Sequence, residues 1–312
     1  MTVPRFAIGQ TVRVRKPRIG VVLGVGGLVG LGYHVHVLSD LRRRGLLDID
    51  DAEVLVGTSA GSLVGGLLAS GVTLDELRAA IDPSADSPLA GALARLLGLR
   101  ASALAALKRP ERPPRGLGER RSRAAMWSTS LFADGDLDAL DLAQGFDALL
   151  PTAWPDRLQV CSLTRDTGIR AVWGPHRTTS LATAVAASCA VPGIFRPVDI
   201  AGELHVDGGF WSPTNADVLL GRHLDHVVIV SPMSAPPGSL PVTADHPLRI
   251  GLHMLVAREA RALRRHGVPV TIVEPTRAVR QAMGVNFMAS DRIPSIEMAI
   301  VGSPGPSVLI AG

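Results

Sequence analysis

The stretch Val54-Leu55-Val56-Gly57-Thr58-Ser59-Ala60-Gly61-Ser62-Leu63-Val64 decides the fold expected for this chain. An apolar run typical of a buried strand leads into G-T-S-A-G, and an apolar, helix-like run over residues 62–69 follows at once. A serine on so sharp a turn needs small neighbours, here Gly57 and Gly61, because larger residues would keep the helix from packing back on the strand. The first N–H groups of the helix would lie beside the hydroxyl. A serine in this position suits nucleophilic attack on the carbonyl carbon of an ester or amide. The alternative is a glycine-rich turn without chemistry.

A second glycine-rich loop lies one strand earlier. Residues 19–23 predict an apolar strand, Gly24-Val25-Gly26-Gly27-Leu28-Val29-Gly30 follows, and residues 31–41 predict a helix. Such a loop presents N–H groups to an anion, either a dinucleotide pyrophosphate or the oxyanion of acyl transfer. The dinucleotide pattern G-x-G-x-x-G fails in register, because it requires glycine where Val29 stands. The oxyanion alternative is favoured, since consecutive parallel strands end side by side and place this loop next to Ser59.

A candidate base occurs much later in the chain. The segment Glu203-Leu204-His205-Val206-Asp207-Gly208-Gly209 places an aspartate at the end of a predicted short strand, and the two glycines allow another backbone to approach closely. Asp-Gly is also an ordinary turn dipeptide, so this segment alone favours a turn. Together with Ser59 and the glycine loop, it favours Asp207 as the base.

These three pieces, in this order, resemble the patatin-like phospholipase family. The run Gly30-Leu31-Gly32-Tyr33-His34-Val35-His36-Val37-Leu38 resembles the helix that follows the oxyanion loop of that family. Ala187-Ser188-Cys189-Ala190-Val191-Pro192-Gly193-Ile194-Phe195 resembles its small-residue run before a proline. The resemblance covers roughly residues 18–230 and continues more faintly through residues 283–286. It implies an α/β protein with a three-layer α/β/α patatin-like fold and a mostly parallel central sheet.

The resemblance also implies a site and an activity. Ser59 would be the nucleophile and Asp207 would activate it directly, in a dyad without histidine. The backbone N–H groups of three residues would form the oxyanion hole: Gly26, Gly27 and Leu28. The remaining motif positions are glycines: Gly30, Gly57, Gly61, Gly208 and Gly209. The implied reaction is hydrolysis of a lipid or other acyl ester, as a phospholipase, lysophospholipase or esterase, without cofactor or metal.

Two departures from the family pattern concern the glycine loop. Val25 stands where members usually have glycine, and Val29 stands where they usually have a basic residue. The backbone tolerates Val25 if its dihedral angles avoid the region reserved for glycine. The loss of a basic residue at Val29 removes a positive charge near the site. These departures keep open a non-catalytic binding protein on a patatin-like scaffold.

A second alternative is an α/β-hydrolase with a Ser-His-Asp triad. Ser59, Asp207 and a later histidine would give the required chain order, and three histidines qualify: His223, His226 and His253. That fold reaches its nucleophile only after several strands, whereas Ser59 follows the second predicted strand. The dyad is therefore favoured.

Composition agrees with one large enzyme domain. The chain has 312 residues and a formal net charge of +4, and we expect a catalytic domain over residues 17–312 behind an N-terminal tail of residues 1–16. The two cysteines, Cys161 and Cys189, lack metal or redox spacing and are predicted to be buried apolar residues. Further along, the sequence predicts a strand pair over residues 158–173, a strand over residues 227–230, and a helix over residues 246–266 followed by a final strand.

The stretch of residues 83–126 differs from the rest in composition. A Leu/Ala-rich, helix-like part over residues 89–107 precedes a basic part broken by prolines, over residues 108–123. This pattern favours a solvated surface insertion, and the alternative is a cap or a membrane-facing surface. The modest charge and the low aromatic content do not favour nucleic-acid binding. The sequence predicts a cytoplasmic protein, with peripheral contact to an anionic membrane as an alternative, because no apolar run reaches transmembrane length.

Overall fold

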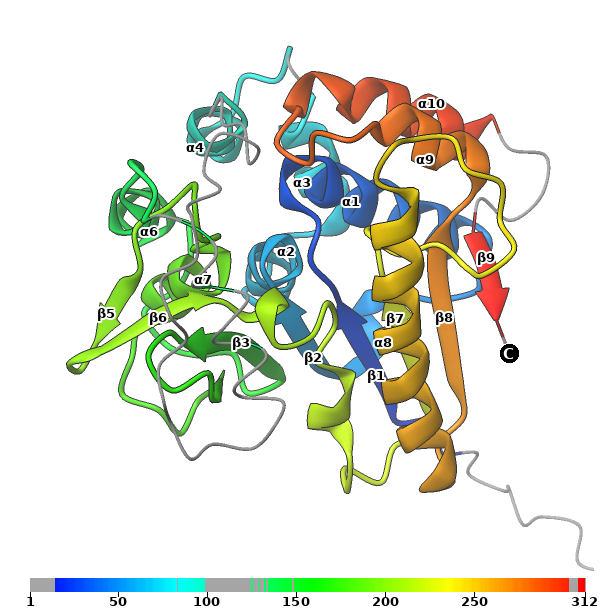
Figure 1. The fold of residues 1–312 in the computed structure, drawn as a ribbon, viewed down its shortest axis with the longest axis horizontal. Coiled ribbons are helices and arrows are strands. Elements are labelled where there is room, and N and C mark those ends of the chain that lie inside the picture. Colours follow the sequence, from blue (N-terminus) through cyan, green and yellow to red (C-terminus); the bar gives the residue numbers. More distant parts are fainter. Residues whose placement is uncertain are drawn as a thin grey trace, which may run out of the picture.

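A nine-stranded sheet lies at the centre of the part of the protein that the computed structural model describes, residues 15–82, 84–98, 125, 129, 132, 134–147, 149–302 and 308–311. The strand order is β5-β6-β3-β2-β1-β7-β8-β9, and β4 pairs with β3 (Figure 1). The bounds are β1 Ile19–Leu23, β2 Ala52–Thr58, β3 Leu158–Thr164, β4 Arg170–Trp173, β5 Val198–Ile200, β6 Glu203–Asp207, β7 His226–Val230, β8 Val270–Pro275 and β9 Val308–Ala311. The inner strands from β3 to β8 are parallel, and antiparallel pairs complete both ends. The expected mostly parallel sheet is confirmed.

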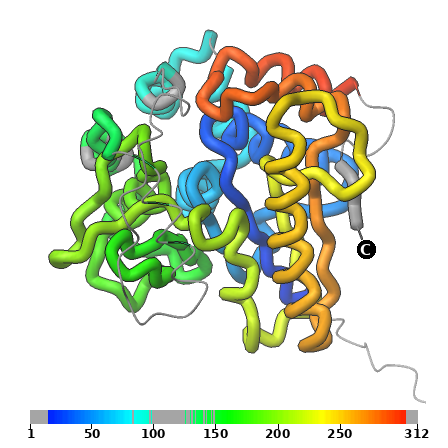
Figure 2. Tube along the Cα trace, in the orientation of Figure 1, coloured from blue at the N-terminus to red at the C-terminus, as the bar shows by residue number. Residues whose placement is uncertain are grey.

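Helices cover both faces of this sheet. Those described are α1 Gly27–Arg43, α2 Ala60–Ala69, α3 Leu74–Ala80, α4 Pro88–Leu97, α6 Ala139–Asp147, α7 Leu181–Cys189, α8 His246–Arg265, α9 Arg277–Met283 and α10 Ile293–Val301. Short 3-10 turns are η1 Ile49–Asp51, η3 Gly208–Phe210, η4 Ala216–Leu219 and η5 Ser290–Arg292. In Figure 2 the green part of the chain gathers at one end of the sheet and the yellow-to-red part at the other.

Two hydrophobic cores show the layering. Successive strand residues point to opposite faces, so Val21 and Leu23 of β1 join the core under α1, α2 and α7, whereas Val22 joins the core under α8 and η4. Figure 1 shows α8 lying across β7 and β8 on that second face. The fold is therefore a three-layer α/β/α arrangement, as the sequence predicted.

The first helix begins earlier than the sequence predicted. It starts at Gly27 instead of Leu31, so the glycine loop shortens to residues 24–26 and the remaining glycines enter the first turn. The N–H of Gly30 donates to the carbonyl of Gly26 at 2.8 Å, which closes that turn. Glycine costs a helix roughly 1 kcal/mol per residue, and here tertiary contacts override that preference.

The predicted tail and insertion lie largely outside the described residues. Of the tail, Arg15 pairs with Asp225 at 2.9 Å and Lys16 with Asp51 at 2.5 Å, both on the surface. Of the insertion, α4 accounts for part of the predicted Leu/Ala-rich helix. The basic segment of residues 108–123 falls outside the described residues, so its role stays a prediction.

The inner strands should carry much of the stability. Leu55 of β2 is fully buried in the larger core. Leu55→Ala should lower the free energy of unfolding by roughly 2–5 kcal/mol, through lost transfer energy and a residual cavity. Leu240→Ala is the control, because Leu240 is 60% exposed and its truncation should change stability by less than about 0.5 kcal/mol. Urea denaturation followed by circular dichroism measures both, and equal small losses would contradict this account of the core.

Candidate active site

Ser59 lies on a strained turn between β2 and α2. Its backbone φ is 55° and ψ is −127°, a region that costs a residue with a side chain about 1–3 kcal/mol. Gly61 permits the turn, since a Cβ there would lie 2.1 Å from the carbonyl oxygen of Leu23. Gly57 does the same on the strand side, where a Cβ would lie 2.5 Å from the Cα of Ser62. The predicted strand–turn–helix is present, and its glycines are steric requirements.

Hydrogen bonds from side chains of α7 and α2 hold this turn in place. The N–H of Ser59 donates to Oγ of Ser188 at 2.9 Å, and that hydroxyl donates to the carbonyl of Cys161 at 2.7 Å. Oγ of Ser62 donates to the carbonyl of Ser59 at 2.7 Å. Ser188 therefore ties the turn to β3 from the end of α7.

Strand register brings Asp207 to the serine. β2 ends at Thr58, which pairs with Cys161, but β3 continues past that point to Thr164. The part of β3 that extends beyond β2 pairs with β6 in antiparallel fashion, and Asp207 stands opposite Ser162. The last residue of β6 thus arrives level with the turn that follows β2. The sequence did not predict this antiparallel pairing of β6, whereas the parallel pairing of β1 with β2 confirms the neighbouring strand ends expected for the glycine loop and Ser59.

The Asp207 carboxyl is buried. The N–H of Gly209 donates to its Oδ1 at 2.7 Å. Burial raises the pKa of Asp207 from its ordinary value of 3.8 to about 7, and the nearby hydroxyl of Ser59 and the N–H of Gly209 oppose that rise. The group therefore changes protonation near neutral pH, where a general base is most effective.

An asparagine joins the ends of the two strands. Nδ2 of Asn215 donates to Oγ1 of Thr58 at 3.1 Å and to the carbonyl of Ser212 at 3.0 Å, and it lies 3.4 Å from the carbonyl of Gly208. Its own backbone is left-handed, with φ 54°, a conformation that asparagine tolerates better than most residues. Asn215 thus links the residue before Ser59 to the residue after Asp207.

Three backbone N–H groups in the glycine turn have no protein acceptor within the described part of the chain: those of Gly26, Gly27 and Leu28. The groups on either side are occupied, because Val25 donates to Pro213 at 2.9 Å and Val29 donates to Phe287 at 3.1 Å. The three unpaired donors form the N-terminus of α1, where the helix dipole also favours negative charge.

The glycine turn is fixed from both sides. Nε2 of buried His34 donates to the carbonyl of Gly24 at 2.8 Å, and burial lowers the pKa of His34 to about 4, so the ring stays neutral. Gly27 has φ 57°, and a Cβ there would lie 2.5 Å from the ring and the carbonyl of Phe287. Val25 has no positive φ, so the first departure from the family pattern is accommodated without strain.

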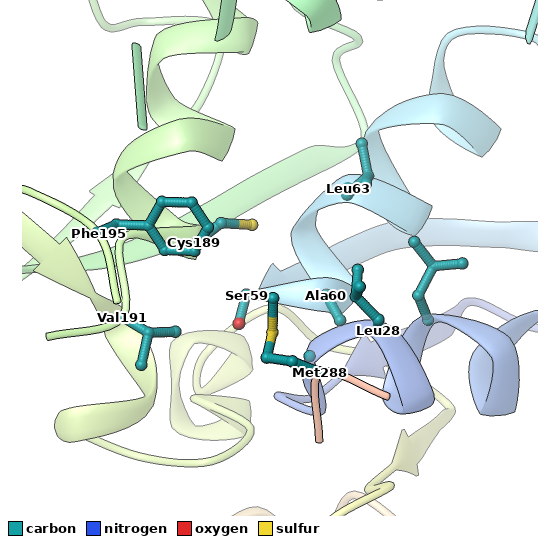
Figure 3. Close-up of a pocket in the computed structure, with 10 residues that line it drawn as sticks. Leu28, Ser59, Ala60, Leu63, Cys189, Val191, Phe195 and Met288 are labelled. Carbon is teal, nitrogen blue, oxygen red and sulfur yellow. The ribbon is translucent and has the colours of Figure 1, made fainter. Parts of the chain in front are cut away.

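A small pocket joins the serine to the glycine turn (Figure 3). Its cavity volume is about 40 Å³, and ten residues line it: Gly27, Leu28, Leu31, Ser59, Ala60, Leu63, Cys189, Val191, Phe195 and Met288. Apart from the serine hydroxyl and the cysteine thiol, the lining side chains are apolar. The walls suit an apolar group bonded to a carbonyl at Ser59.

The three histidines of the triad alternative lie elsewhere. His226 is the first residue of β7, at the opposite end of the strands from the turn, and its ring lies 2.9 Å from Oγ1 of Thr271. His253 lies within α8 and its Nδ1 is 2.9 Å from Glu274. His223 is exposed in the turn before β7. No hydrogen bond of the described residues joins any of them to Ser59 or Asp207.

Sequence reasoning did not assign roles to three supporting residues. Ser188, Asn215 and His34 each hold a backbone or side chain at the site through buried hydrogen bonds. The only local signal for Ser188 is a polar residue within an apolar, small-residue helix. Their partners are distant in the chain or depend on helix orientation, which the sequence does not reveal.

A family model, described as patatin-like phospholipase, matches residues 21–220, well over half of the chain. The chain belongs to the patatin-like phospholipase family. Uncharacterized NTE family proteins of Mycobacterium bovis and Mycobacterium tuberculosis are 28% identical to it over 216 residues, which cover 69% of this chain and 49% of theirs. The chain therefore spans about half the length of the curated relatives it matches.

Two solved structures align with most of this chain. VipD from Legionella pneumophila aligns with a TM-score of 0.41 at 14% identity, covering 91% of this chain and 67% of that one. Human GIVD cytosolic phospholipase A2 aligns with a TM-score of 0.38 at 11% identity, covering 84% of this chain and 50% of that one.

Among the described residues, none of the helices combines the length and the apolar character needed to cross a bilayer. Those residues also contain no cluster of three or more His, Cys, Asp or Glu side chains arranged to hold a metal ion.

The raised pKa of Asp207 has a consequence for stability. Its protonated form favours the folded state, and this contribution is complete below about pH 4 and is lost as the pH rises through about 7. Asp207→Asn removes the titration, so the stability of the variant relative to wild type should rise between about pH 4 and pH 8, by up to a few kcal/mol. Urea denaturation at the two pH values measures the difference. Asp166→Asn, at an exposed aspartate, should show no such trend; a flat profile for Asp207→Asn would refute the buried-acid description.

Proposed function

We propose that this protein is a serine hydrolase of lipid acyl esters that uses Ser59 and Asp207 as a catalytic dyad. The observation that carries the proposal is the placement of the buried Asp207 carboxyl next to the Ser59 turn, beside three N–H groups that no described residue accepts. Family membership supports the ester-hydrolase chemistry. The substrate class, a lipid acyl ester, follows from the family and from the apolar pocket next to Ser59.

The reaction follows from the positions of these groups. Oγ of Ser59 attacks the acyl carbonyl carbon, and Asp207 accepts the hydroxyl proton. The carbonyl oxygen gains negative charge and accepts hydrogen bonds from Gly26, Gly27 and Leu28. The C–O bond to the alcohol breaks, and protonated Asp207 gives its proton to the leaving oxygen.

The second half of the reaction releases the acid. Water attacks the acyl-serine carbonyl while Asp207 accepts one of its protons, and the same N–H groups hold the second oxyanion. The ester bond to Ser59 breaks, and the serine oxygen regains a proton from Asp207. Each group returns to its starting state, and the products are an alcohol and a carboxylic acid.

Ser59→Ala should abolish hydrolysis of p-nitrophenyl butyrate and labelling by a fluorophosphonate, since removal of a nucleophile costs several orders of magnitude in turnover. Ser70→Ala is the matched control, because Ser70 caps the other end of α2 and its Oγ donates to the carbonyl of Gly66, away from Ser59. Circular dichroism checks that both variants fold.

Two outcomes would contradict the proposal. Wild-type turnover in folded Ser59→Ala would remove the serine from the mechanism. A histidine variant as inactive as Ser59→Ala, among His223→Gln, His226→Gln and His253→Gln, would favour a triad instead.

A further inference from the structure

One short connection touches all three parts of the site. It joins η3 to η4, and the carbonyl of its Pro213 accepts a hydrogen bond from the N–H of Val25 in the glycine turn at 2.9 Å. Two residues later, Nδ2 of Asn215 reaches Oγ1 of Thr58 and the carbonyl of Gly208. Thr58 precedes the serine in the chain, and Gly208 follows the aspartate. The position of this connection therefore determines how the nucleophile, the base and the oxyanion donors lie relative to one another.

Asn215 makes this link in only one orientation of its side-chain amide. Nδ2 faces two carbonyl oxygens, those of Gly208 and Ser212. A carbonyl oxygen accepts hydrogen bonds and cannot donate them, so the inverted amide would place its own oxygen against two others. The residue is fully buried, so bulk water does not reach the amide to offset that repulsion. The link therefore depends on whatever holds the amide oxygen on the opposite side.

Arg170 of β4 holds the amide oxygen. Its Nη1 donates to Oδ1 of Asn215 at 3.2 Å, and the same nitrogen donates to the carboxylate of Asp217 in η4. The guanidinium also lies over the ring of Trp211, 5.6 Å from the ring centroid. Because a guanidinium only donates hydrogen bonds, it selects the amide oxygen and leaves Nδ2 directed at the site.

Arg170 acts from outside the pocket. Neither Arg170 nor Asn215 is among the residues that line the cavity beside Ser59. The side chains of Arg170 and Asp217 are 18% and 21% exposed, so water still reaches their ion pair. Such a pair adds little to the stability of a fold. Removal of Arg170 should therefore leave the protein folded while it frees the amide of Asn215.

We propose that Arg170 is a positioning residue for the hydrolysis. By fixing the amide of Asn215, it keeps the end of β2 and the start of η3 at the separation that proton transfer from Ser59 to Asp207 requires. The proposal rests on the proposed function, because it concerns the proposed dyad. Arg170 does not line the substrate pocket, so its loss should lower kcat and leave KM nearly unchanged.

The test measures kcat and KM separately with p-nitrophenyl butyrate. Arg170→Ala should lower kcat by about 10²-fold, because a shift of about 1 Å between reacting groups costs that much, and KM should stay within about twofold of wild type. Methylguanidinium ion added to the assay should restore part of kcat, since it can occupy the space that the truncation leaves between Asp217 and Asn215. Arg165→Ala is the matched control, because Arg165 follows β3 directly and pairs with two surface aspartates. It should keep wild-type kcat, with or without methylguanidinium.

A second pair of variants tests whether Arg170 acts through Asn215. Asn215→Asp keeps the shape of the side chain and the bond from Arg170, but it turns an oxygen toward the carbonyls of Gly208 and Ser212. It should lower kcat by about 10²-fold as well. The variant that carries both Arg170→Ala and Asn215→Ala should have the kcat of Asn215→Ala alone, because residues of one network are not additive.

The outcomes distinguish this proposal from the proposed function. Wild-type kcat in folded Arg170→Ala or in folded Asn215→Asp would overturn the positioning role, and so would fully additive losses in the double variant. An Arg170→Ala variant that does not fold would also overturn it, because a role in folding would then explain the loss. Hydrolysis that persists in Ser59→Ala would instead overturn the proposed function, whatever the Arg170 variants show.

Discussion

The contact between Gly61 and the end of β1 positions everything else at the site. With no Cβ at residue 61, the first turn of α2 approaches the carbonyl of Leu23 more closely than any other residue would permit. Because β1 leads within a few residues into α1, the N-termini of α1 and α2 come to lie together on neighbouring strands. One helix start carries the serine and the other carries the unpaired N–H groups. The strain at Ser59 is the cost of this approach, and the bonds through Ser188 and Ser62 offset it.

The second requirement is a carboxyl group buried at that junction. Taking an ionised carboxylate out of water is unfavourable, and the raised pKa of Asp207 reflects this cost. The nearby hydroxyl of Ser59 and the N–H of Gly209 recover part of it, which keeps the group near the midpoint of its titration at neutral pH. A base in this state needs no imidazole to take a proton from the serine. The burial that raises the pKa of Asp207 comes from the register in which β6 pairs with β3 and from η3, which follows Asp207 directly.

The sequence predicted those features that reside in contiguous segments. The turn at Ser59, the glycine turn and the Asp207-Gly208-Gly209 segment each have a local pattern, and so does the alternation of strands and helices. The sequence did not predict the antiparallel pairing of β6, because register depends on strands far apart in the chain. It also placed the start of α1 too late, since glycine is a poor helix former and the packing of Phe287 on Gly27 is a tertiary effect. Ser188 and Asn215 were missed for the same reason.

The central claim is that Asp207 activates Ser59 without a histidine. The most direct measurement is the rate constant for fluorophosphonate labelling of Ser59 as a function of pH, in wild type and in Asp207→Asn. The account predicts that the wild-type rate rises with pH through an apparent pKa near 7, as Asp207 ionises, and that the Asn variant loses this rise together with most of its reactivity. Labelling of Asp207→Asn at the wild-type rate, with the same dependence on pH, would show that another group is the base.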